Sequence, residues 1–160
     1  MKCEPQKEHQ WLQELVGDWV GEGEAEMEPG KPPVHWQTRE QVRSLGDVWV
    51  LFEGSGEMPE CGFATTLTTL GYDPQKQHYV GTFVGSMMTS LWIYEGTLDA
   101  GGKVLTLETE GPDMAHEGRT TKYRDVLEIK SRDHRILKSF MLGPDREWHG
   151  FMTANYRRKI

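Results

Sequence analysis

The chain is poor in cysteine and has no long apolar run. Only two of its 160 residues are cysteines, Cys3 and Cys61, and no CxxC spacing joins them. We therefore expect neither a zinc site nor a disulfide framework, and both thiols are predicted to be free. Nowhere do about 18 apolar residues follow one another, and the first residues lack the apolar segment of a secretory signal. We expect a cytoplasmic protein.

Basic residues are in the minority. The chain has 18 Lys and Arg against 25 Asp and Glu, a formal net charge of -7. Because such a charge repels phosphate backbones and anionic headgroups, nucleic acid and membrane surfaces are not expected as partners. The Gly21-Glu22-Gly23 and Gly54-Ser55-Gly56 segments lack the rest of a phosphate-binding loop, and no Gly-x-Ser-x-Gly elbow occurs. Nucleotide binding and serine-hydrolase chemistry are therefore not expected.

One helical stretch opens the sequence. Apolar residues from Trp11 to Val16 recur at helical spacing and Gly17 follows as a stop, which predicts one short helix over 8–16 behind a flexible tail of residues 1–7. From Asp18 onward the apolar period changes to two, as in strands with one buried face.

Breaks rich in glycine, proline and aspartate divide the remaining chain into about ten strands. They are predicted over 18–28, 34–45, 47–56, 63–72, 77–86, 89–99, 103–111, 119–131, 134–143 and 147–158. The short connections predict antiparallel hairpins. An open sheet of this size would leave two exposed edges, whereas closure removes both. We predict an all-β fold, a single closed up-and-down antiparallel barrel over residues 1–160 with the short helix closing one end.

Alternation in the later strands predicts a polar group inside the barrel. In the segment 122–129, Tyr123 and Asp125 share a face with Leu127, so Asp125 is predicted to point inward. A buried carboxylate needs a partner, and an inward arginine such as Arg39 or Arg124 is the structural interpretation. The functional interpretation is that Asp125, with Tyr94 and Tyr123, orients a ligand.

Small and hydroxyl side chains in the middle strands predict free space inside the barrel. The candidate cavity residues are Trp36, Phe52, Thr66, Thr68, Met88, Trp92, Tyr94, Tyr123, Asp125 and Met152. Further methionines either line an adaptable apolar pocket or fill gaps in a packed core, and these are Met27, Met87, Met114 and Met141.

The Gly17-Asp18-Trp19 segment directly after the helix resembles the G-x-W signature of lipocalins and other calycins. The resemblance implies that Trp19 lies at the closed end of the barrel beneath an arginine of the last strand, by a cation–π contact. Arg157 and Arg158 are the candidates. We favour Arg158, because Trp148, Met152, Ala154 and Tyr156 are then expected to share its face.

More closely, the chain resembles a bacterial lipocalin-like family, domain of unknown function family 1579, and more distantly nitrobindin and fatty-acid-binding barrels. The resemblance covers nearly the whole chain, through motifs such as Thr69-Leu70-Gly71-Tyr72-Asp73-Pro74, Trp92-Ile93-Tyr94-Glu95-Gly96-Thr97-Leu98 and Phe151-Met152-Thr153-Ala154-Asn155-Tyr156-Arg157-Arg158. It implies the fold and no particular activity.

The leading functional hypothesis is non-enzymatic binding of a small hydrophobic or amphipathic molecule inside the barrel, without a cofactor and without catalytic residues. One alternative is a haem protein, since nitrobindins hold haem through one histidine; His149 and His116 are candidates by location, although the six histidines show no metal-binding spacing. Another is a small-molecule enzyme that uses the inward carboxylate and tyrosine. A homodimer through exposed Leu91 and Ile93 is compatible with each.

Overall fold

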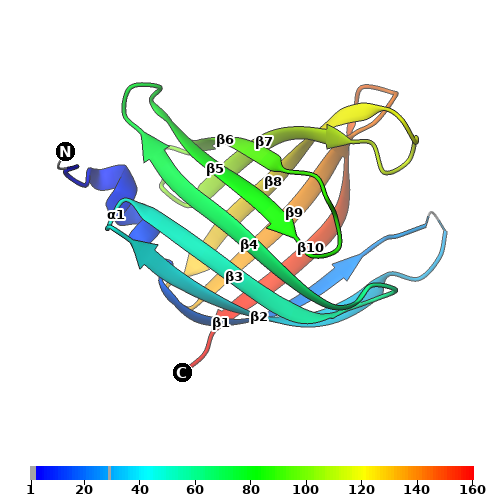
Figure 1. Ribbon diagram of the computed structural model, residues 1–160, viewed down its shortest axis with the longest axis horizontal. Helices are drawn as coiled ribbons and strands as arrows, with labels where there is room; N and C mark the ends of the chain where they lie inside the picture. The colour runs from blue at the N-terminus through cyan, green and yellow to red at the C-terminus, as the bar shows by residue number, and fades with distance from the viewer. Residues whose placement is uncertain (1–2, 29) are drawn as a thin grey trace.

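Ten antiparallel strands form one closed barrel, and one helix lies against an end of it (Figure 1). The computed structural model describes residues 3–28 and 30–160. The elements are α1 Lys7–Gln13, β1 Gly17–Ala25, β2 Val34–Leu45, β3 Trp49–Met58, β4 Gly62–Asp73, β5 His78–Gly85, β6 Trp92–Leu98, β7 Val104–Pro112, β8 Thr120–Ser131, β9 His134–Leu142 and β10 Trp148–Arg158. The predicted fold is confirmed.

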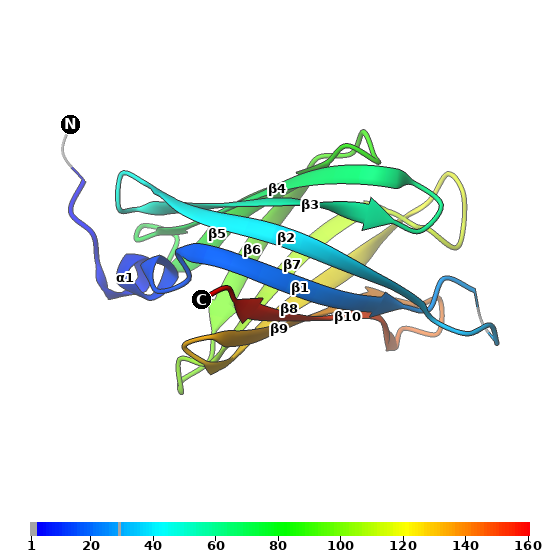
Figure 2. The same ribbon diagram turned by 90° about the horizontal axis from the view of Figure 1, so that it is seen from below.

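The sheet closes because the first strand pairs with the last. Each strand pairs with its sequence neighbours, and β1 pairs antiparallel with both β2 and β10. At the seam Trp19 lies opposite Arg158 and Ala25 lies opposite Met152. Figure 2 shows β1 between β2 and β10, with the C-terminal end of the chain on the side of α1. The closed sheet leaves no long unpaired edge.

The helix is shorter than predicted and closes one end of the barrel. It begins at Lys7, inside the expected tail, of which Met1 and Lys2 lie outside the described residues. Buried His9 accepts the Gln6 amide proton at Nδ1 (2.9 Å), and its Nε2 donates to the Tyr72 carbonyl oxygen (3.0 Å). Because so short a helix is unstable alone, these contacts and the packing of Leu12, which is 0% exposed, hold it in place.

Several strand boundaries differ from the predicted ones. Gly56 was expected to end its strand, yet β3 continues to Met58, and a Cβ at Gly56 would stand 2.5 Å from the Gln37 carbonyl oxygen of β2. The turn comes later, at Glu60 and Gly62, whose φ values of 67° and 71° lie in the left-handed region. The strand expected from residue 89 begins at Trp92.

A β-bulge in the last strand reverses its pattern of faces. The register of β10 against β9 shifts between Gly150 and Met152. Met152, Ala154 and Tyr156 point inward, but Trp148 lies on the outer face, where the Arg124 guanidinium is 4.0 Å from its ring centroid. The expectation that Trp148 shares the face of Arg158 is therefore wrong, because a bulge inserts one residue and breaks the period of two.

The end of the barrel beside α1 is filled with apolar side chains around Trp19. This tryptophan is 2% exposed, and its indole N–H donates to the Leu15 carbonyl oxygen at 2.9 Å. The Arg158 guanidinium lies 4.3 Å from the Trp19 ring centroid and also donates to the Val16 and Glu14 carbonyl oxygens. Arg158 thus joins the last strand to the end of the helix, over the tryptophan.

Replacing Trp19 tests this end of the barrel. We expect Trp19→Ala to lower the free energy of unfolding by about 3 to 5 kcal/mol, because it empties a fully packed site. Urea denaturation gives the value. Trp49→Ala is the matched control, since Trp49 is 39% exposed and should lose much less. An equal loss in both variants would contradict the assignment.

Candidate ligand-binding site in the barrel interior

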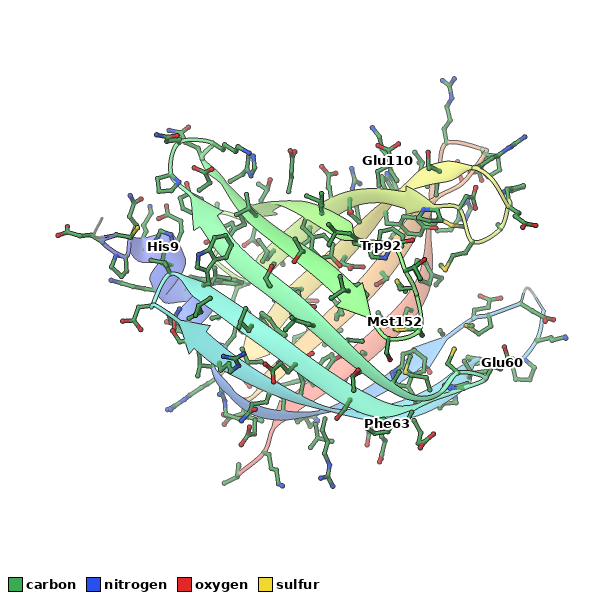
Figure 3. The ribbon with its side chains drawn as sticks, viewed as in Figure 1. His9, Glu60, Phe63, Trp92, Glu110 and Met152 are labelled. Carbon is green, nitrogen blue, oxygen red and sulfur yellow. The ribbon has the colours of Figure 1, made fainter. Side chains whose placement is uncertain are left out.

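The interior is packed at the α1 end and open at the other. The buried core cluster includes Leu12, Leu15, Trp19, Val42, Val50, Leu70, Tyr79, Leu105 and Leu127, and Phe83 and Met152 pack against the cluster from the open side. Towards the opposite end the inward side chains keep surface that water can reach, and these half-buried residues are Trp36, Thr38, Thr66, Thr68, Phe83, Trp92, Met141 and Met152. We call these two parts the closed half and the open half. Figure 3 shows Trp92 and Met152 at the end away from His9.

Aromatic rings lie against the wall of the open half because glycines face them. A Cβ at Gly23 of β1 would collide with the Trp36 ring of β2, and one at Gly111 of β7 would collide with the Trp92 ring of β6. Without a Cβ beneath them, both rings can approach the backbone of the neighbouring strand. Both rings therefore lie close to the wall of the barrel.

A polar cluster of three residues lies deep in this space. Asp125 of β8 accepts a hydrogen bond from Tyr94 of β6 at Oδ2 and one from Ser139 of β9 at Oδ1, the latter at 2.6 Å. Tyr94 and Ser139 are each 5% exposed, whereas Asp125 is half-buried as a whole residue. The Asp125 carboxylate is itself buried, and its side chain points into the barrel together with those of Tyr94 and Ser139.

Burial dominates the titration of this cluster. It raises the pKa of Asp125 above the ordinary value of 3.8, and the hydrogen bonds from Ser139 and Tyr94 oppose this shift only in part. Burial, and then the neighbouring Asp125 charge, raise the pKa of Tyr94 well above its ordinary value. Tyr94 consequently stays protonated and remains a donor to Asp125.

The predicted arginine partners of Asp125 are wrong. Arg124 points outward, where its Nε donates to Glu108 at 2.9 Å, and Arg39 is exposed on the outer face of β2. Neighbouring residues of a strand face opposite sides, so Arg124 cannot follow Asp125 inward. A tyrosine and a serine take the place that was assigned to an arginine.

The inward arginine is Arg135 of β9, which the sequence argument missed. Arg135 is 2% exposed, forms an ion pair with Glu40 of β2, and lies 4.4 Å from the Trp19 and 4.3 Å from the Tyr156 ring centroids. Burial lowers its pKa to about 10, so it stays charged at neutral pH. The period of two in β9 also places Arg135 on the face of Ser139, a signal that could have identified it.

Three more of the predicted residues, Met88, Trp92 and Tyr123, lie at the end of the barrel opposite α1, which we call its mouth. The Trp92 indole N–H points to Met88 Sδ at 2.9 Å, and the Trp92 ring meets Tyr123 edge-on with centroids 5.1 Å apart. The Tyr123 hydroxyl donates to the Pro112 carbonyl oxygen at 2.5 Å, so it does not join the Asp125 cluster. Tyr123 thus shapes the mouth and holds the loop after β7.

The structure separates the remaining candidates. Phe52, Thr66, Thr68 and Met152 all face the interior on β3, β4 and β10. Met27 and Met114 are 60% and 67% exposed, so neither lines the interior.

The histidine candidates are on the surface. His149 lies at the rim, exposed, with its Nε2 2.9 Å from an Asp145 carboxylate oxygen, and exposed His116 lies 3.2 Å from Asp113. Within residues 3–28 and 30–160, no group of three or more His, Cys, Asp or Glu side chains is placed to hold a metal ion. Cys3 and Cys61 are free and exposed.

Two hollows indent the outer wall of β1 to β4. They measure about 560 and 1080 Å³ and share Val20, Arg39 and Ser55 in their linings. Further around the wall, Leu91 and Ile93 are 59% and 63% exposed. The outer hollows contain neither the Asp125 cluster nor the aromatic residues of the open half other than Trp36.

The comparisons with known proteins agree with this architecture. A family model described as "Protein of unknown function (DUF1579)" matches residues 4–158. The chain belongs to this family, which confirms the resemblance seen in the sequence. No curated protein matches the chain. In the part of the chain that the structure describes, no helix has the length and apolar character needed to cross a membrane.

Two solved structures share the fold at low sequence identity. Rv2717c from M. tuberculosis is 14% identical with a TM-score of 0.66, and the match covers 98% of this chain and 100% of that one. The S-type phycobiliprotein lyase CPES from Guillardia theta is 12% identical with a TM-score of 0.61, covering 98% of this chain and 99% of that one. Both likenesses show the ten-stranded barrel and leave the activity open.

The raised pKa of Asp125 has a testable effect on stability. The folded chain binds this proton more tightly than the unfolded chain, so the group lowers stability as pH rises from about 3.8 towards its folded pKa. We expect Asp125→Asn to gain stability relative to the parent over that range and to keep a constant advantage above it. Urea unfolding at a series of pH values measures the difference.

In the control variant, stability relative to the parent should change with pH in the opposite direction. The backbone N–H groups of Lys103 and Val104 lower the pKa of Asp99. Asp99→Asn should therefore lose stability relative to the parent as pH rises through that lowered pKa. The same trend in both variants would contradict the burial of Asp125.

A second experiment tests the buried ion pair. Glu40→Gln and Arg135→Met should each lower the free energy of unfolding by about 3 kcal/mol, because each leaves one buried group uncompensated. The double variant should lose less than the sum of both. The matched control is the exposed pair Arg43 and Glu53, whose coupling should stay within about 1 kcal/mol. Additive losses at Glu40 and Arg135 would refute the pairing.

Proposed function

We propose that the protein is a binding module that holds a small, largely apolar molecule in the open half of the barrel. The observation that carries this proposal is the contrast between the two halves of the interior: the closed half is packed, and the open half keeps accessible aromatic, methionine and threonine side chains. Proteins fill interior space unless a ligand or water occupies it.

The lining of the open half suits such a ligand. Trp36, Phe83, Trp92 and Met152 offer apolar surface, from which most of the affinity of a small-molecule site comes. Asp125 supplies one polar anchor at depth. Sites of this kind combine mostly apolar walls with a few polar groups that fix orientation, and the open half has that composition.

The neighbouring structures are compatible with this function. One of them is named a phycobiliprotein lyase, and the match covers 98% of this chain. At 12% identity the likeness supports the fold that the proposal requires and does not specify a ligand.

Filling the open half should abolish binding without unfolding the barrel. We expect Thr68→Trp to raise the Kd for N-phenyl-1-naphthylamine, a neutral apolar fluorophore, by about tenfold or more, since losing a few buried apolar contacts costs over 1.4 kcal/mol. Fluorescence titration measures the Kd, and a thermal melt verifies the fold.

The control variant distinguishes the interior from the outer wall. Thr65 lies three residues earlier on β4, faces outward and lines the smaller outer hollow. Thr65→Trp should leave the Kd unchanged. Binding that is lost in Thr65→Trp and kept in Thr68→Trp would move the site to the outer wall and refute the proposal.

A further inference from the structure

The carboxylate of Asp125 lies deep in the barrel, and no cationic side chain among the described residues is paired with it. Its oxygens accept hydrogen bonds from Tyr94 and Ser139, both uncharged donors. A buried carboxylate in this state is costly, because neutral donors replace only part of its hydration.

The other charges of the interior do not compensate it. Arg135 is already paired with Glu40, and its guanidinium lies among the rings of Trp19, Tyr156 and Phe52. From the strands around Asp125, β6 presents Tyr94, β7 presents Leu107, β9 presents Ser139 and β10 presents Tyr156. Arg135 is paired with Glu40, and Arg158, over Trp19, is paired with Asp133, so neither arginine is paired with Asp125.

Asp125 has hydrogen-bonding capacity that the protein does not use. Each oxygen accepts one protein hydrogen bond, and a carboxylate oxygen can accept two. Asp125 keeps accessible surface although its donors are buried. Between it and the mouth lie the paired, inward rings of Phe83 and Trp92, whose faces attract cations.

We propose, on the basis of the binding function above, that the ligand carries a protonated amine, which donates to Asp125 while its apolar body extends towards the mouth. An ammonium group would supply the cationic partner that Asp125 lacks among the described residues and the donors that its free lone pairs can accept. A carboxylate head would meet a like charge, and an alcohol would satisfy hydrogen bonding without the charge.

Three amphiphiles of equal chain length test this assignment. Isothermal titration of n-decylamine, n-decanol and n-decanoate below their micellar concentrations compares a cation, a neutral donor and an anion on the same apolar body. We expect the amine to bind about tenfold or more tighter than the alcohol, as a charge-assisted hydrogen bond exceeds a neutral one, and decanoate to bind weakest.

Two variants test whether Asp125 causes the preference for decylamine over decanol. Asp125→Asn should reduce the affinity for the amine to that for the alcohol and leave the alcohol unchanged. Glu95→Gln is the matched control, because Glu95 is exposed on the outer face of β6 and its loss removes the same overall charge. The affinity for the amine should be unaffected there.

The pH dependence supplies a test that needs no variant. Decylamine stays protonated across the acidic range, so its advantage over decanol in the parent protein should vanish as pH falls through the raised pKa of Asp125. Tyr94, the other titratable group in contact with Asp125, keeps its proton throughout this range. An advantage that is independent of pH would overturn the assignment.

The outcomes separate this inference from the proposed function. Equal affinities for the three amphiphiles, or tightest binding of decanoate, would overturn the amine and leave the apolar site standing. A preference for the amine that survives in Asp125→Asn would place the charge elsewhere. If none of the three bound, the proposed function would fail together with the inference.

Discussion

The pairing of β1 with β10 determines how the whole chain is arranged. It converts a ten-stranded meander into a barrel, and only a barrel has an interior that one short helix can close. The seam is reinforced where it meets the helix, because Arg158 lies opposite Trp19, contacts its ring and donates to carbonyl oxygens at the end of the helical segment. Closure, helix and core are therefore one cooperative unit at that end.

Arg135 and Asp125, two of the ionisable groups of the interior, are stabilised in different ways. Arg135 has a carboxylate partner and aromatic rings around it, the arrangement of a structural charge that holds the closed half together. Asp125 has two neutral donors, accessible surface and a pKa raised by burial. A carboxylate whose pKa is raised by burial is typical of sites that bind a ligand. The closed half is packed, and we propose that the open half is the part that binds a ligand.

The sequence was sufficient for the fold and for the inward direction of Asp125, since the period of two and the spacing of turns reflect local physics. The sequence did not predict the features that depend on tertiary contacts. The bulge after Gly150 moved Trp148 outward, and a bulge has no strong signal in one sequence. The partners Tyr94 and Ser139 come from β6 and β9, and their contact with Asp125 depends on the register of four strands. Arg135 could have been found, because its strand keeps a regular alternation.

The proposed function depends on the open half of the barrel. A crystal structure of the protein as purified would show this half directly. We expect continuous density in the open half, from Asp125 towards Trp92 and Met152, for a bound molecule or for ordered water. Inward side chains that collapse onto one another between Trp36 and Phe83 and leave no such space would contradict it.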